Sequence, residues 1–202
     1  MQRDLRAIVA REAARLLYFG VVEEYYAAKR LAAENLGVNV LPSNREIALA
    51  LDEFADLIEG EDRAKRLVKM REDALELMLI LKDYRPRLIG SVWRGTITRN
   101  SDIDIEVFSE NVDDVVETLI KNGIKEIRVE EVKKHTDDLK RVFIHIKTKS
   151  RRGFEVDIAV RDSNDHDKYE ICEIFGDLKK GLSIKELKRV LRENPVQKFV
   201  PI

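Results

Sequence analysis

The sequence contains little cysteine, proline or glycine. Its 202 residues include one cysteine, four prolines and nine glycines. The single cysteine, Cys172, excludes an internal disulfide framework and a zinc site built from several cysteines. No internal repeat and no low-complexity linker interrupts the chain. The composition therefore indicates a folded chain that is stable without covalent cross-links.

An excess of charge of one sign is also absent. Lysine and arginine number 37 against 38 aspartates and glutamates, which leaves a formal net charge of −1. This balance argues against an acidic tail, a generic basic coat for DNA and a polybasic membrane anchor.

Long apolar runs are missing as well. No run approaches the roughly 20 residues that a membrane-spanning helix requires. The first residues, Met1-Gln2-Arg3-Asp4, are not followed by the uninterrupted apolar stretch of a secretory signal. We therefore expect a cytoplasmic protein with no membrane partner.

What the sequence does contain is a large charged fraction and an ordinary apolar one. Charged residues make up 37% and hydrophobic residues 44% of the chain, which argues against wholesale disorder. A folded chain of 23.4 kDa should expose about 9,700 Å² and bury about 70% of the surface of the unfolded chain. This length predicts one domain, or one domain with a helical appendage.

The first 84 residues have helical periodicity. Apolar residues recur at helical spacing in three stretches, 5–36, 47–58 and 67–81. Gly20 can bend the first helix, and residues 60–62 separate the second from the third. Ser43 and Glu46 are spaced as a capping box at the start of the second helix. We predict an N-terminal helical domain, residues 1–84, whose apolar helices could also form a homo-oligomer interface.

The pattern changes at Pro86. Alternation of polar and apolar residues predicts strands over 102–108, 127–132, 141–148 and 154–160. Helical patterns cover 112–122, 167–175 and 183–193. A turn at Gly153 joins the last two strands, which should form a hairpin. Residues 85–202 are therefore the predicted second domain, and the chain is expected to be α+β, with a mixed β-sheet and helices flanking one face.

The stretch from Gly90 to Asp104 carries the chemically informative residues. Asp102 and Asp104 occupy positions i and i+2 of a strand, so both carboxylates project from one face, roughly 6–7 Å apart. Their charges repel each other unless a cation lies between them. Paired oxygen donors of this kind suit Mg²⁺. Glu106 follows on the same face, and we interpret it as a solvated surface residue rather than a further ligand.

A second strand supplies a third carboxylate. Apolar residues alternate around Asp157 in residues 154–160, which places Asp157 on the polar face of that strand. If the two strands are neighbours, Asp157 joins Asp102 and Asp104 in one cluster. Three convergent carboxylates can hold two divalent ions.

Gly90 and Ser91 supply the kind of turn that binds phosphate. A glycine lets backbone N–H groups and the serine hydroxyl approach phosphate oxygens closely. Arg94 lies three residues further on, and its guanidinium fork suits phosphate. We predict that Gly90, Ser91 and Arg94 bind a nucleotide. Trp93 could stack on a base, but packing beneath the turn is an equal alternative.

Together, Gly90-Ser91, the triplet Arg94-Gly95-Thr96, the pair Asp102 and Asp104, and Asp157 resemble the signature of the DNA polymerase β-type nucleotidyltransferase superfamily. The resemblance covers residues 88–160 and is silent about the substrate. It implies a polymerase β-type domain after the helical bundle. It also implies Mg²⁺-dependent transfer of a nucleoside monophosphate from an NTP, with release of pyrophosphate.

The resemblance also implies roles for single residues. Asp102 and Asp104 would be catalytic and would ligate both Mg²⁺ ions, and Asp157 would be catalytic and would ligate one of them. Gly90 and Ser91 would hold the β- and γ-phosphates. ATP is the expected NTP, although nothing in the sequence identifies the preferred base.

Several alternatives stay open. The acceptor hydroxyl could belong to an RNA 3′ end, a protein or a small molecule. The chain could be an antitoxin-like adenylyltransferase that modifies a partner protein, or a catalytically inactive nucleotide- or RNA-binding module of the same fold. His145 is interpreted as a surface histidine, with substrate contact as the alternative. The basic segment 133–152 could bind phosphate or form a solvated hairpin tip.

Overall fold

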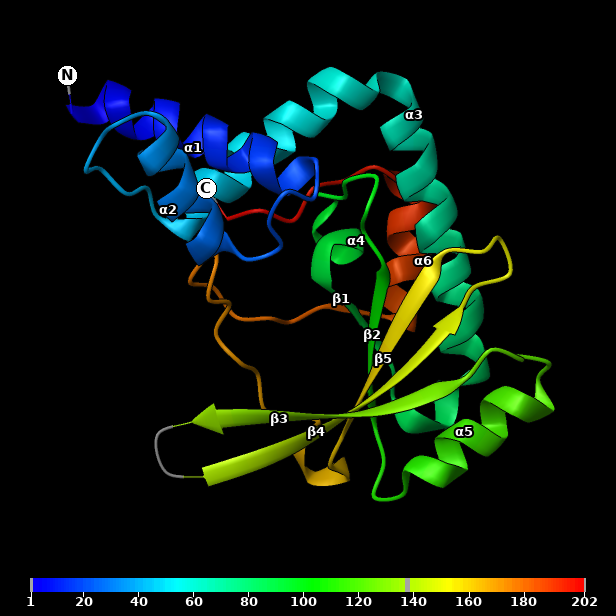
Figure 1. Ribbon diagram of the computed structural model, residues 1–202. Coiled ribbons are helices and arrows are strands. Elements are labelled where there is room, and N and C mark those ends of the chain that lie inside the picture. The colour runs from blue at the N-terminus through cyan, green and yellow to red at the C-terminus, as the bar shows by residue number, and fades with distance from the viewer. Residues whose placement is uncertain (1, 137–138, 202) are drawn as a thin grey trace.

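A helical lobe stands beside a single six-stranded sheet in the computed structural model, which describes residues 2–136 and 139–201 (Figure 1). The helices are α1 (Gln2–Tyr18), α2 (Tyr25–Asn35), α3 (Asn44–Ile80), α4 (Gly90–Arg94), α5 (Val112–Lys121) and α6 (Ile184–Glu193), with short 3₁₀ turns η1 (Lys82–Tyr84) and η2 (Ser163–Asp165). The strands are β1 (Arg87–Ile89), β2 (Ile103–Phe108), β3 (Arg128–Thr136), β4 (Leu139–Lys149), β5 (Glu155–Arg161) and β6 (Leu182–Ser183). This is the predicted α+β class.

The helical lobe consists of α1, α2 and the first half of α3. The predicted helix over 5–36 is in fact two helices, because the chain turns between them at Gly20, whose φ is +67°. The capping box at the start of α3 is confirmed, since Ser43 accepts a hydrogen bond from the Glu46 N–H and the Glu46 carboxylate accepts one from the Ser43 N–H. Small side chains pack where the helices cross: Ala13, Ala28 and Ala32. A homo-oligomer through these helices stays a prediction.

The predicted interruption at residues 60–62 is confirmed. Gly60 has a φ of +53° and a ψ of −136°, and α3 turns sharply there (Figure 1). Only the second half of the helix packs on the sheet, through Leu67, Met70, Ala74 and Met78. The hydrophobic core that packs against the sheet therefore includes residues from the second half of α3. The predicted domain boundary between residues 84 and 85 stays a prediction.

The sheet has the strand order β3-β4-β5-β2-β1-β6 and is mixed, because β2 and β5 run parallel while their other neighbours pair antiparallel. The predicted hairpin is formed by β4 and β5. One face buries Ile103, Ile105 and Val107 of β2 against α3, α5 and α6. The opposite face carries the polar side chains that alternate with them, as the period of two requires.

The predicted helix over 167–175 is wrong. This segment forms a loop held by an antiparallel bridge between Ile171 and Leu178, with backbone bonds from Cys172 N to Asp177 O (2.7 Å) and from Lys179 N to Glu170 O (2.8 Å). These pairings satisfy the backbone groups that a helix would have satisfied internally. Cys172 is buried, as expected of a small apolar side chain, but it lies in this loop. The final predicted helix is confirmed as α6.

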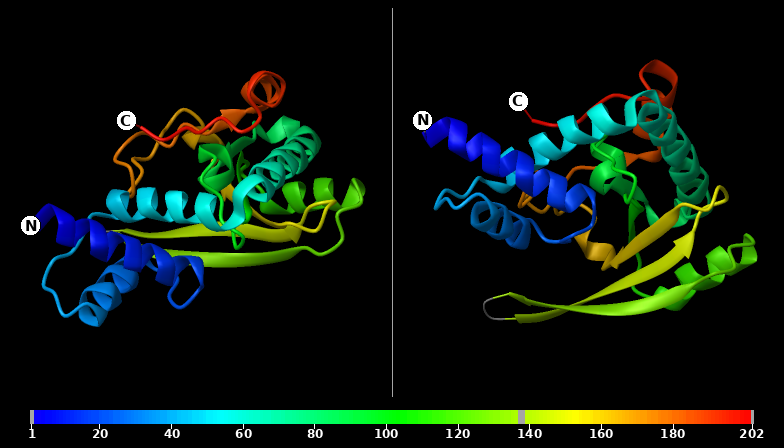
Figure 2. Two further views of the ribbon diagram at one scale, coloured as in Figure 1. Left: turned by 90° about the horizontal axis from the view of Figure 1, so that it is seen from above. Right: turned by 45° about the horizontal axis from the view of Figure 1, so that its top comes forward.

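The molecule exposes 12,316 Å², more than the 9,700 Å² or so expected for its mass. Figure 2 shows why, since α1 and α2 project to one side of the sheet instead of covering it. Within the described parts of the chain, none of the helices combines the length and the apolar character needed to span a membrane.

Candidate active site

Three aspartates converge at one place on the open face of the sheet. Asp104 of β2 pairs directly with Asp157 of β5 in the parallel register, and Asp102 immediately precedes β2. Each residue offers an oxygen atom, and these atoms all lie within 4.8 Å of one another. The structure therefore brings together the three carboxylates that the sequence places on two separate strands. We call Asp102, Asp104 and Asp157 the triad.

The triad carboxylates are electrostatically unequal. Burial, together with the charges of Asp102 and Asp157, raises the pKa of Asp104 to about 8. Burial also raises the pKa of Asp102. Burial alone would raise the pKa of Asp157 too, but hydrogen bonds from His145 and Lys147 outweigh it and lower that pKa. Asp104 consequently holds a proton at neutral pH until a cation compensates its charge.

Two side chains of β4 contact Asp157. His145 Nδ1 lies 2.9 and 3.0 Å from the two carboxylate oxygens of Asp157, and Lys147 Nζ donates to Oδ2 at 2.7 Å. The interpretation of His145 as an ordinary surface residue is wrong, because the β4–β5 pairing turns its side chain toward the triad. Lys147 directly opposes Asp157 in the antiparallel register. His145 and Lys147 are two positions apart on β4 and therefore lie on the same face of the strand. His145 is among the residues singled out from the sequence, and this spacing would have indicated Lys147 as well.

Gly90 and Ser91 lie beside the triad at the turn from β1 into α4. Gly90 has a φ of +68°, and a Cβ added there would lie 1.9 Å from Asp104 Oδ2. Only glycine therefore permits the backbone to approach this carboxylate so closely. Ser91 is partly exposed, and its hydroxyl has no hydrogen-bond partner among the described residues. Its donor and acceptor capacity is available to a ligand.

Arg94 points into the protein rather than lying free beside the Gly-Ser turn. Its Nη1 and Nη2 bond the Asp177 carboxylate at 3.1 and 2.6 Å, and Nη1 also bonds Phe199 O at 2.9 Å. The guanidinium lies over the rings of Trp93 and Phe175 at 4.3 and 4.7 Å from their centroids. Trp93 is itself buried, which agrees with the packing interpretation. The predicted contact of Arg94 with a nucleotide stays a prediction.

Arg71 of α3 holds the end of α4 in place, a role that no local sequence pattern predicts. Its side chain is fully buried and bonds four backbone carbonyls: Val92 O at 3.1 Å, Trp93 O at 2.9 Å, Pro195 O at 2.7 Å and Gln197 O at 2.8 Å. Burial lowers the pKa of the guanidinium to about 10, so it stays charged at neutral pH. Arg71 thereby connects α3, α4 and the C-terminal segment behind the Gly-Ser turn.

A cavity of about 340 Å³ opens on the same face of the sheet as the triad, and its lining does not include the three aspartates. It begins at Ile89, the β-pairing partner of Asp104, and at Glu106, two residues along β2. Three aromatic side chains contribute to its wall: Phe108, Phe143 and Tyr169. We call this space the triad cavity. Its volume falls in the range of small-molecule sites.

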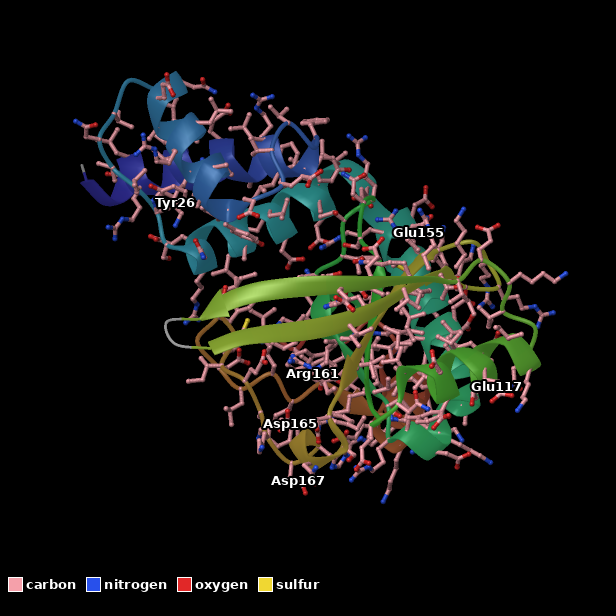
Figure 3. The ribbon with its side chains drawn as sticks, turned by 60° about the horizontal axis from the view of Figure 1, so that its bottom comes forward. Tyr26, Glu117, Glu155, Arg161, Asp165 and Asp167 are labelled. Atoms are coloured by element: carbon pink, nitrogen blue, oxygen red, sulfur yellow. The ribbon has the colours of Figure 1, made fainter. Side chains whose placement is uncertain are left out.

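An ion-pair network lines the triad cavity. Arg161 bonds Glu106 and Glu170, each at 3.0 Å, and Lys179 bonds Glu170 at 3.2 Å. The interpretation of Glu106 as a solvated surface residue is wrong, since its side chain is 13% exposed and paired with Arg161. Figure 3 shows Arg161 on the same side of the strands as the loop that carries Asp165 and Asp167.

The triad has the donor chemistry of a divalent metal site. Its ligand atoms are three carboxylate oxygens, which are the donors that Mg²⁺ selects. The raised pKa of Asp104 reflects negative charge crowded into a partly buried space, and a divalent cation would compensate that charge. The basic segment contributes Lys147 to the site, whereas Arg152 bonds Asp73 and Glu72 away from it. The side chains of 133–142 lie outside the described residues.

Three kinds of comparison relate this chain to known proteins. Comparison with curated proteins finds no match. One solved structure is described as "Structural Basis for the Activity of a Cytoplasmic RNA Terminal U-transferase". It shares 19% identity with a TM-score of 0.34, and the match covers 58% of this chain but only 34% of that one.

The family comparison is more extensive. The sequence model of the nucleotidyltransferase domain matches residues 67–171, from the second half of α3 to the loop after β5. This region includes the triad, the Gly-Ser turn and most of the sheet, and it is more than half of the chain. The chain therefore belongs to the nucleotidyltransferase domain family.

Proposed function

We propose that this protein transfers a nucleoside monophosphate from an NTP, with ATP as the expected donor, to an acceptor hydroxyl. The observation that supports this proposal most directly is the convergence of Asp102, Asp104 and Asp157 beside the Gly-Ser turn. In the reaction an acceptor oxygen bonds to the α-phosphorus as the bond to pyrophosphate breaks. The family assignment supports nucleotidyl transfer as the reaction class.

The triad would hold the metal. Asp102 and Asp104 would ligate two Mg²⁺ ions, and Asp157 would ligate one of them. Bound Mg²⁺ lowers the pKa of the attacking hydroxyl and neutralises the charge of the phosphates. His145 and Lys147 would keep the Asp157 carboxylate ionised and fixed in direction, since both already bond it.

The Gly-Ser turn would bind the phosphates. The backbone of Gly90 lies against Asp104, so a phosphate at the turn would lie next to the triad. The partly exposed Ser91 hydroxyl can donate to a phosphate oxygen. We assign Arg94 a positioning role, because its donors already bond Asp177 and Phe199 and tie α4 to the loop behind it.

The triad cavity would receive a nucleoside of the substrates. Its aromatic walls offer π faces on which a base can stack, and its charged network offers hydrogen bonds to a sugar or base edge. Arg161 and Glu106 lie on the same strands as Asp157 and Asp104. They are the charged side chains of the cavity wall that lie nearest to the triad along those strands and can bond a sugar or base edge.

The decisive experiment incubates the protein with each α-labelled NTP, Mg²⁺, and either cellular RNA, a protein lysate or neither. Label in RNA or in a small product would identify the acceptor, and label in a protein would favour the antitoxin-like adenylyltransferase. The test variant is Asp104→Asn, and the matched control is Asp62→Asn, an exposed residue of α3. We expect transfer to fall at least about 1,000-fold in the first and to stay unchanged in the second.

Equal transfer by the wild type and Asp104→Asn would refute the assignment of the site. No transfer with any NTP and acceptor, together with nucleotide binding that survives Asp104→Asn, would favour the catalytically inactive binding module instead.

A further inference from the structure

A second cavity opens at the other edge of the sheet, where β1 meets β6. It has a volume of about 390 Å³ and is lined by five cationic side chains: Lys82, Arg85, Arg87, Lys180 and Lys185. Its other walls include Tyr169, His166 and the start of α6. We call this space the Arg87 cavity. Its cations come from two stretches of the chain, 82–87 and 180–185, that only the fold brings together.

Little negative charge compensates these cations. Glu186 is the one acidic side chain lining the cavity, and its carboxylate already accepts hydrogen bonds from the Ser183 N–H (2.9 Å) and hydroxyl (2.7 Å). Among the residues that the structure describes, Lys82, Lys180 and Lys185 have no ion-pair partner. The cavity is therefore a concentrated positive site on a protein whose net charge is −1.

Arg87 is the most informative of the five cations. It is only 5% exposed, and its guanidinium lies between the rings of Phe108 and Tyr169, at 4.6 and 4.8 Å from their centroids. Nη2 donates to the backbone oxygen of His166. Nε and Nη1 are buried and have no partner within residues 2–136 and 139–201. Leaving two donors of a buried guanidinium unused costs free energy, and each of these N–H groups can bond an oxygen atom of an anion.

The Arg87 cavity is placed in line with the triad. Arg87 pairs with Glu106 and Ile89 pairs with Asp104 in the β1–β2 register, so Arg87 lies two residues, roughly 7 Å, along the sheet from the triad. Tyr169 lines both the Arg87 cavity and the triad cavity. A phosphate-rich chain bound in the Arg87 cavity could therefore reach the triad cavity over Tyr169.

We propose that the Arg87 cavity binds a backbone phosphate of a single-stranded nucleic acid acceptor whose 3′ end reaches the triad. This inference rests on the proposed function and names its acceptor class. Arg87 donates to a phosphate oxygen from one of its unused N–H groups, the flanking lysines contribute charge, and Tyr169 provides a surface for a base. Cationic grooves combined with aromatic side chains are the usual way in which proteins hold single strands. The donor triphosphate is expected at the Gly-Ser turn instead.

The test measures binding of a fluorescein-labelled single-stranded RNA of about twelve nucleotides by anisotropy, in EDTA and without NTP. The variants are Arg87→Gln and Lys180→Ala/Lys185→Ala, the second of which removes only cavity-lining lysines. The matched control, Lys121→Ala/Lys125→Ala, removes the same charge from residues that do not line the Arg87 cavity. Thermal unfolding checks the fold of each variant.

We expect each cavity variant to weaken binding about tenfold and to reduce the slope of log affinity against log salt by about 0.7 per lost phosphate contact. The control pair should change affinity less than about twofold. Equal weakening by the control pair, or unchanged binding by both cavity variants, would overturn the inference. So would a loss of NTP affinity instead of RNA affinity, because the cavity would then belong to the donor nucleotide.

The assay needs neither metal nor turnover, so it separates the two proposals. Transfer activity with RNA binding that ignores the cavity variants would overturn this inference and leave the proposed function standing. RNA binding that depends on the cavity, in a protein that transfers nothing, would support the cavity as a nucleic-acid site and refute the proposed function.

Discussion

Charge is buried in two different ways around the Gly-Ser turn. The triad lies in front of the turn, and Arg71 with the four carbonyls that it bonds, here called the Arg71 cluster, lies behind it. In the triad, three carboxylates crowd together, and the pKa of Asp104 rises to about 8. In the cluster, one guanidinium donates to four carbonyls of α4 and the C-terminal segment. The ionised form of Asp104 is left uncompensated, whereas all three nitrogen atoms of the Arg71 guanidinium donate to carbonyl oxygens.

This difference indicates how the protein separates binding from stability. A buried charge that lacks compensation destabilises the fold but attracts a cation. A buried charge with all its hydrogen bonds made holds elements together, and its loss leaves carbonyls without donors. The turn that we expect to bind phosphate lies between the two, supported from behind by Arg71 and facing Asp104.

The largest expected effect is a loss of transfer activity when a methyl group is added at Gly90, where the turn contacts the triad. Gly90→Ala would place Cβ 1.9 Å from Asp104 Oδ2, so either the turn or the carboxylate must move. We expect transfer activity to fall about 1,000-fold, equivalent to about 4 kcal/mol in the barrier. Steady-state kinetics with the labelled NTP measures this loss.

The control for Gly90→Ala is Gly123→Ala after α5. Gly123 also has a positive φ, +86°, but a Cβ there would meet nothing within 4 Å. It should cost about 1 kcal/mol of stability and leave activity unchanged. Similar activity losses in both variants would mean that backbone strain, and not the contact with Asp104, is responsible.

The next effect tests the other side of the comparison. Arg71→Met keeps much of the buried volume but removes the donors to four carbonyls. The free energy of unfolding should fall by about 3 kcal/mol, measured by urea denaturation. Arg189→Met, an exposed arginine of α6, is the matched control and should change stability by less than about 0.5 kcal/mol. A stable Arg71→Met protein would show that the cluster does not hold the turn.

Asp104 should lower the stability of the folded protein, whereas Arg71 raises it. The effect of Asp104 should depend on pH. The pKa of Asp104 is about 8 in the folded protein and 3.8 in its ordinary state, so the folded protein binds the proton more tightly. Wild-type stability therefore falls, relative to Asp104→Asn, as pH rises from about 4 to 8. In EDTA the variant should be more stable than the wild type at pH 8, with little difference between them at pH 4.

Thermal unfolding across this pH range, followed by circular dichroism, measures the difference. A constant gap between the two proteins, or a gap that shrinks with rising pH, would contradict the assignment of Asp104 as the carboxylate held protonated.

The smallest effect is expected far from both clusters. Ser43→Ala removes the capping box at the start of α3 in the helical lobe. It should cost about 1 kcal/mol of stability and leave transfer activity unchanged, because the sheet and the triad depend on the second half of α3. Urea denaturation and the transfer assay measure the two quantities. A loss of activity here would show that the lobe and the site are coupled.

Local patterns predicted most of the elements and their capping. The alternation in β2 and β5 placed Asp104 and Asp157 on polar faces, and the capping box at Ser43 marked the start of α3. These features depend on residues within a few positions of one another. The same reasoning failed for residues 167–175, which form a loop held by a backbone bridge between Ile171 and Leu178 and by the ion pair of Glu170 with Arg161.

Long-range partners were beyond the reach of local patterns. Glu106 and His145 appeared to be surface residues because their partners, Arg161 and Asp157, lie on neighbouring strands. The partner of Arg94, Asp177, lies 83 residues away. Arg71 reads as an ordinary polar position of a helix, and its burial follows only from the packing of the C-terminal segment on α4.

The sequence by itself determined the chemistry available to this protein: three carboxylates, a Gly-Ser turn and strands that present them on one face. The spacing of these residues is local, and the period of two along a strand determines the face to which each side chain points. Only the tertiary structure decided which charges are compensated. Strand pairing gave Asp157 two hydrogen-bond partners, His145 and Lys147, and left Asp104 and Arg87 without theirs, because compensation depends on distances between segments that are remote in the chain.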